Sequence, residues 1–157
     1  MKNLRTTTLC VCLTLYSLCS SAQNQKIPIN EPDYNKPKLF ENLPDKIPVS
    51  LDNITSLFNS SVGRPVNISL AEGRQFQFEG QVVSTASKFE NTLQSIVVRS
   101  TNYNGATLTV SRITSPEGIV TYTGRIISFQ HGDLYELQNK DGIYTLVKRN
   151  FYDLVNE

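Results

Sequence analysis

Residues 93–129 read LQSIVVRSTNYNGATLTVSRITSPEGIVTYTGRIISF, and this stretch decides the fold. Apolar and polar residues alternate over 93–101, 107–114 and 119–129, which is the two-residue period of a half-buried strand. Asn104-Gly105 and Pro116-Glu117-Gly118 separate the three runs and are typical of tight turns. Because connections this short can join only antiparallel neighbours, the stretch predicts three consecutive antiparallel strands.

The same alternation continues on both sides of this stretch. Further strands are predicted at 66–70, 75–85, 133–138 and 143–149. The turn formers between them are Glu72-Gly73, His131-Gly132 and Asp141-Gly142. A flat sheet of this width would expose a whole apolar face, so the sheet has to curl. We therefore predict a mainly β domain, with α+β as the alternative class, built as a six- to seven-stranded curled antiparallel sheet or small barrel.

One short amphipathic helix is predicted near residues 50–60, ahead of the first of these strands. Its apolar face consists of Leu51, Ile54, Leu57 and Phe58, at the spacing of one helix face. Ser50 is the expected N-cap, with a hydroxyl that can accept a hydrogen bond from the first turn. Gly63 marks a stop beyond the last turn. A helix this short is stable only if its apolar face lies on another element.

The first 22 residues have the organisation of a secretory signal peptide. Lys2 and Arg5 precede an apolar run at 9–18, and Ser20-Ser21-Ala22 supplies the small residues of a cleavage site. The apolar run is roughly half of the ~20 residues that a membrane span requires. We therefore predict a secreted or periplasmic protein with no integral membrane segment in the mature chain.

Residues 23–48 are predicted to form an extended spacer that is rich in proline and lysine. They contain five of the seven prolines, which exclude a continuous helix or a central strand. Leu39, Phe40 and Leu43 form an apolar cluster that either pins the spacer to the domain or serves as a docking peptide. Pinning is favoured because small domains rarely leave such a cluster in water. The remainder, 49–157, is predicted to be a single β-rich domain.

The composition of the predicted mature chain excludes several classes of function. All three cysteines lie within the first 22 residues, and His131 is the single histidine of the chain. These counts exclude a disulfide scaffold, thiol catalysis, zinc clusters and haem attachment. Removal of Lys2 and Arg5 changes 15 bases against 14 acids to 13 against 14, so no nucleic-acid partner is indicated. We predict no cofactor and no metal, and the oligomeric state stays open.

Four arginines are the candidate binding residues: Arg99, Arg112, Arg125 and Arg149. All lie in predicted strands, and three of them share a strand face with apolar residues near the end of that strand. Such a group could bind a carboxylate or a peptide terminus through paired hydrogen bonds. The alternative is that each aliphatic stem covers the edge of the core while the charged head meets water or an acid.

His131 and Asp133 are the candidates for catalysis. A histidine general base would need an orienting acid, which Asp133 could supply, together with a nucleophile. A His-Gly pair is also a competent hairpin turn, and the sequence has no strained nucleophile elbow beside it. We therefore predict an exported, non-catalytic domain that contacts a protein or peptide through an arginine-bearing sheet surface. The alternatives are a small secreted hydrolase that uses His131 and Asp133, or a barrel that binds a small apolar ligand.

Overall fold

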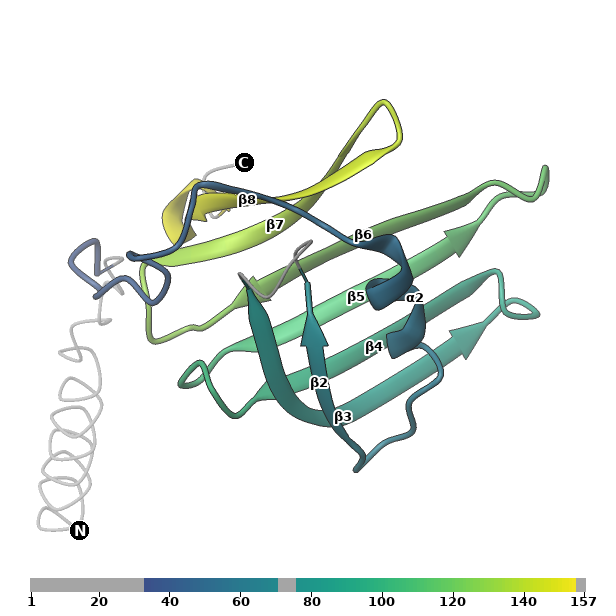
Figure 1. The fold of residues 1–157 in the computed structure, drawn as a ribbon, viewed down its shortest axis with the longest axis horizontal. Helices are drawn as coiled ribbons and strands as arrows, with labels where there is room; N and C mark the ends of the chain where they lie inside the picture. Colours follow the sequence, from purple (N-terminus) through teal and green to yellow (C-terminus); the bar gives the residue numbers. More distant parts are fainter. Residues whose placement is uncertain (1–32, 71–75, 155–157) are drawn as a thin grey trace, which may run out of the picture. The chain divides into compact units, whose positions relative to one another are not determined.

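Eight antiparallel strands form one curled, half-barrel sheet in the residues that the computed structural model describes, 33–70 and 76–154. The strands are β1 (Lys46–Pro48), β2 (Pro65–Ser69), β3 (Gln77–Lys88), β4 (Leu93–Ser100), β5 (Thr107–Thr114), β6 (Val120–Ile127), β7 (Asp133–Lys140) and β8 (Ile143–Asn150). Strands β2 to β8 follow one another as a meander (Figure 1). Strand β1 adds to the outer edge of β8.

The predicted mainly β class is confirmed, with eight strands in place of the predicted six or seven. The additional strand is β1, which has three residues and lies inside the segment predicted to be a spacer. Proline at 48 is compatible with this position because β1 is an edge strand, where a missing backbone donor costs little.

Strand β3 bends, and this bend lets the sheet curl (Figure 1). Its pairing with β4 shifts register between Val82 and Ser84, so Val83 is the extra residue of a β-bulge. The close approach of β4 requires glycine at position 80, because a Cβ atom there would lie 2.3 Å from the carbonyl oxygen of Arg99. The half of β3 before the bulge can therefore turn, together with β2, away from the rest of the sheet.

The inner face of the curled sheet carries the hydrophobic core. Its strand residues include Ile68, Phe78, Val82, Ile96, Val98, Leu108, Val110, Ile126, Leu137 and Leu146, all at most 9% exposed. Aromatic rings fill the space between them, and the ring of Phe40 lies 5.0 Å from the ring of Tyr135. Phe40 is completely buried. The predicted spacer therefore contributes a central side chain to the core.

Residues 33–48 are held to the sheet by backbone hydrogen bonds as well. The carboxylate of Asp133 accepts hydrogen bonds from the amides of Leu39 (2.6 Å) and Phe40 (2.9 Å). The amide of Gly132 donates to the carbonyl oxygen of Pro37 (3.0 Å). The unit that contains these residues runs from Asp33 to Glu157. The predicted leader, 1–22, and spacer residues 23–32 lie outside the described residues, as does the predicted turn at 72–73.

Helix α2 (Leu51–Leu57) lies over the inner face, with Ile54 and Leu57 buried. The expected side-chain cap is wrong, because Ser50 occupies the N-cap position without a side-chain hydrogen bond. The backbone holds this end of the helix. The amide of Val49 donates to the carbonyl oxygen of Tyr144 in β8 (3.0 Å), and the amide of Ser50 donates to that of Leu70 (3.2 Å), just after β2. Residues 49–50 thus connect the two ends of the sheet.

The described residues contain no cysteine and hence no disulfide. None of the helices in this part of the chain has the length and apolar character that crossing a membrane requires.

Candidate functional site

The four candidate arginines lie on opposite faces of the sheet. Residues directly paired across antiparallel strands point to the same face, so the register assigns each side chain to a face. Arg112 has the parity of the buried Val110 and lies on the inner face. Arg99, Arg125 and Arg149 lie on the outer face, in β4, β6 and β8 respectively. The structure therefore separates Arg112 from the other three.

Strands β6 and β7 pair over only half of their length. Four residue pairs join them, from Ile127–Leu134 to Gly124–Leu137, whereas β5–β6 and β7–β8 each pair over eight. Beyond Gly124 and Leu137 the strands separate, and Figure 1 shows the β7–β8 hairpin leaving the line of β6. We call this opening the fork. Its sides are residues 120–123 of β6 and 138–140 of β7, and its closed end is the Gly124–Leu137 pair.

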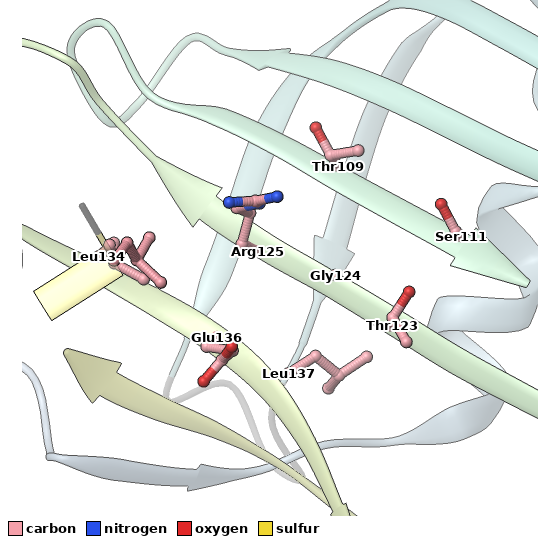
Figure 2. A pocket seen from close by; sticks show the side chains of 9 residues that line it. Thr109, Ser111, Thr123, Gly124, Arg125, Leu134, Glu136 and Leu137 are labelled. Atoms are coloured by element: carbon pink, nitrogen blue, oxygen red, sulfur yellow. The ribbon is translucent and has the colours of Figure 1, made fainter. Parts of the chain in front are cut away.

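A hollow of about 410 Å³ lies on the outer face at the closed end of the fork. It is lined by Thr109, Ser111, Thr123, Gly124, Arg125, Leu134, Glu136, Leu137 and Leu154 (Figure 2). The volume falls within the range of roughly 300–1,000 Å³ that is usual for ligand sites. The lining combines three hydroxyl groups and a guanidinium with leucine side chains, so it can contact both polar and apolar parts of a ligand.

The charged groups of the hollow differ in their partners. Glu136 Oε2 lies 3.6 Å from Arg149 Nε and accepts a hydrogen bond from the side-chain amide of Gln138 (2.9 Å). Arg125 lies directly across from Glu136 in the register, between the strand of Thr109 and that of Glu136 (Figure 2). Within the described residues, however, Arg125 forms no ion pair, and its side chain is exposed. The hollow therefore offers one guanidinium with no acid within ion-pair distance in the described residues.

Two tyrosines close the inner side of the fork. The backbone amide of Tyr122 in β6 donates to the hydroxyl oxygen of Tyr144 in β8, at 3.1 Å. The Tyr122 hydroxyl in turn lies 3.1 Å from Thr55 Oγ1 of helix α2. Since Tyr144 lies beyond β7, the Tyr122 amide points away from β5 and into the fork. The Tyr144 hydroxyl therefore accepts the hydrogen bond that the carbonyl group of a neighbouring strand would otherwise accept from the Tyr122 amide.

The two candidate catalytic residues do not meet as a histidine–acid pair. His131 Nδ1 lies 2.8 Å from Ser128 Oγ, inside the turn between β6 and β7, and Ser128 is completely buried. Both carboxylate oxygens of Asp133 accept backbone hydrogen bonds from the segment that contains Phe40. The sequence reasoning missed the Ser128–His131 contact. The signal for it was the three-residue spacing within a predicted turn, where hydroxyls commonly bond locally.

Across the described ranges, no group of three or more histidine, cysteine, aspartate or glutamate side chains is placed to hold a metal ion. No known protein family, curated protein or solved structure matches this chain.

Proposed function

We propose that this protein is an exported, non-catalytic binding domain that holds an extended segment of a partner polypeptide at the fork between β6 and β7. The observation that carries the proposal is the hollow beside the closed end of the fork, where Thr123 of the unpaired β6 edge lies next to further hydroxyl groups and to Arg125. The predicted leader favours a partner outside the cytoplasm.

The strand edges of the fork support an extended ligand. Residues 120–123 pair only with β5, and residues 138–140 pair only with β8. An edge of this kind is a template for a further strand, and proteins use it to bind peptides. Residues 120–123 read VTYT, which favours the strand conformation and includes neither proline nor charge.

The two outer edges of the sheet are less suited to this role. Strand β1 has three residues and includes Lys46 and Pro48, both of which discourage edge pairing. At the other edge, the carbonyl oxygen of Ser69 in β2 accepts a hydrogen bond from the Asn53 side chain (2.6 Å). The fork is therefore the better site for an added strand.

The side chains around the fork favour an amphipathic peptide. Successive residues of an added strand would point alternately to the outer and the inner face. Outward residues would meet Thr123, Ser111 and Arg125, and inward residues would meet the rings of Tyr122 and Tyr144. Polar and apolar residues in alternation would satisfy both faces.

The experiment is a peptide selection followed by titration calorimetry. Random octapeptides are selected on the wild-type protein, and the affinity of an enriched peptide is compared for wild type, Arg125→Ala and Arg99→Ala. Arg99 is a matched control, since it is an exposed arginine of the outer face that does not line the hollow. Loss of a charge-assisted contact should weaken binding at least about 10-fold in Arg125→Ala. Arg99→Ala should bind within about twofold of wild type.

Two results would overturn the proposal. If no peptide is enriched from the random octapeptides, the protein does not bind extended polypeptides and the proposal falls. If both arginine variants bind like wild type, the hollow is not the site.

A further inference from the structure

We infer that the segment held in the fork is the free C-terminus of the partner chain, an inference that rests on the proposed function. The fork ends at the Gly124–Leu137 pair, beyond which β6 and β7 are paired to each other. A strand that enters between them therefore cannot continue in the plane of the sheet past this pair. A chain end fits such a closed site, whereas an internal segment would have to turn out of the sheet.

The charged group that stands open at the closed end of the fork is a cation, Arg125. Arg125 directly follows Gly124 of the closed pair in β6, and it has no ion-pair partner in the described part of the chain. The acid of the hollow, Glu136, already contacts Arg149 and Gln138. A carboxylate would pair with the open guanidinium through short, charge-assisted hydrogen bonds. A terminal ammonium would meet that guanidinium as a like charge.

The directions of β6 and β7 set the direction of the bound chain. Strand β6 runs from the open end of the fork at Val120 toward the closed end at Gly124, and β7 runs the opposite way. A peptide with its carboxylate at the closed end therefore lies parallel to β6 and antiparallel to β7. The free edges of the fork have four and three residues, so the last three or four residues of the partner would be read, over roughly 10–13 Å.

The backbone amide of Tyr122 is the donor that the ligand would use. In the structure the Tyr122 amide bonds the phenol of Tyr144, a side chain that is 5% exposed. A peptide carbonyl entering the fork would replace that phenol as the acceptor. Binding then exchanges one hydrogen bond for another at this amide, and leaves it satisfied in both states.

The test compares two sets of the same synthetic random octapeptides, one with free C-terminal carboxylates and one with C-terminal amides, both acetylated at the N-terminus. We expect enrichment from the free-carboxylate set only. Amidation of an enriched peptide should weaken its binding to wild type at least about 10-fold. The same amidation should change binding to Arg125→Ala and Arg125→Gln by less than about twofold, because the group that reads the carboxylate is gone. Arg99→Ala should keep the full response.

The possible failures are distinguishable. If amidated peptides bind as tightly as free ones, the C-terminus is not what is read, and the proposed peptide site stands. If amidation weakens wild type and the Arg125 variants equally, the carboxylate is bound away from Arg125 and the inference is overturned. If neither set is enriched, the inference and the proposed function both fall.

Discussion

The hydroxyl of Tyr144 is the group that satisfies the fork when no ligand is present. In Tyr144→Phe the Tyr122 amide loses its acceptor, which should cost about 1–3 kcal/mol of unfolding free energy. A bound peptide would then supply the missing acceptor, so binding should become tighter by the same free energy, about 5- to 150-fold. Urea unfolding and calorimetry with the selected peptide measure the two effects.

Tyr103→Phe is the matched control for this variant, since the Tyr103 hydroxyl forms no hydrogen bond within the described residues. It should change stability and affinity little. Equal effects of the two substitutions on both quantities would contradict the role assigned to Tyr144.

Tyr135 should make the stability of the protein fall as the pH rises in the alkaline range. Burial raises the pKa of its hydroxyl above the ordinary value, and the nearby charges of Asp133 and Asp45 raise it further. The unfolded chain loses this proton near pH 10, while the folded chain retains it. Above that pH the unfolded state binds fewer protons than the folded state, so stability should fall as pH rises, by up to about 1.4 kcal/mol per pH unit. Well below pH 10 the contribution of this group should be constant, so it should add no pH dependence to stability.

Urea unfolding between pH 8 and pH 11.5 tests this expectation on wild type and Tyr135→Phe. The variant loses the hydrogen bond from Tyr135 to the carbonyl oxygen of Pro44, so it should be less stable throughout. Its alkaline decline should nevertheless be shallower. If stability falls equally steeply with rising pH in the two proteins, Tyr135 is not the source of the alkaline decline.

At the scale of elements, the segment before the helix is a structural part of the domain. Phe40 is completely buried against Tyr103 and Tyr135, so Phe40→Ala should lower the unfolding free energy by about 3–5 kcal/mol. Tyr34→Ala is the control from the same segment, at 67% exposure, and should cost much less. Chemical denaturation measures both. A negligible effect of Phe40→Ala would mean that residues 33–48 are a loose tether.

The strands were predictable from the sequence because their alternation is local. The fifth strand was predicted at 107–114 and is Thr107–Thr114. Strand β3 was predicted at 75–85 but runs over Gln77–Lys88, because residues 84–88, beyond the bulge at Val83, are all exposed and show no alternation of burial. Strand β1 was not predicted, because three residues carry no period and their strand conformation depends on pairing with the distant β8.

The faces of the arginines were less accessible to sequence reasoning. Strands β4 and β8 carry apolar residues on both faces, so an arginine in phase with some of them need not face the core. Arg149 shares a face with Val147, whereas the buried side chains of β8 are Tyr144 and Leu146. The fork was not predicted. Strand β7 was predicted to end at 138, and Gln138-Asn139-Lys140 are all polar, so no alternation indicates whether this end pairs with β6.

At the scale of the whole described unit, the fork is a local departure from complete pairing between neighbouring strands. Every other neighbouring pair in the meander from β3 to β8 is joined over seven or eight residues, and residues 49–50 tie the two ends of the sheet together. The rest of the sheet therefore holds β6 and β7 in place on either side of the fork. On the proposed function, a ligand strand would fill the opening without breaking existing backbone pairs.

Amide hydrogen exchange, measured residue by residue with and without a free-carboxylate peptide, tests the central claim most directly. Amides of 120–123 and 138–140 that face the fork should exchange rapidly in the free protein, except for Tyr122, which the phenol of Tyr144 protects. A saturating peptide should slow them at least about 10-fold and leave the edges at β1 and β2 unchanged. Slow exchange along both sides of the fork before any peptide is added, or new protection confined to another edge of the sheet, would contradict the account.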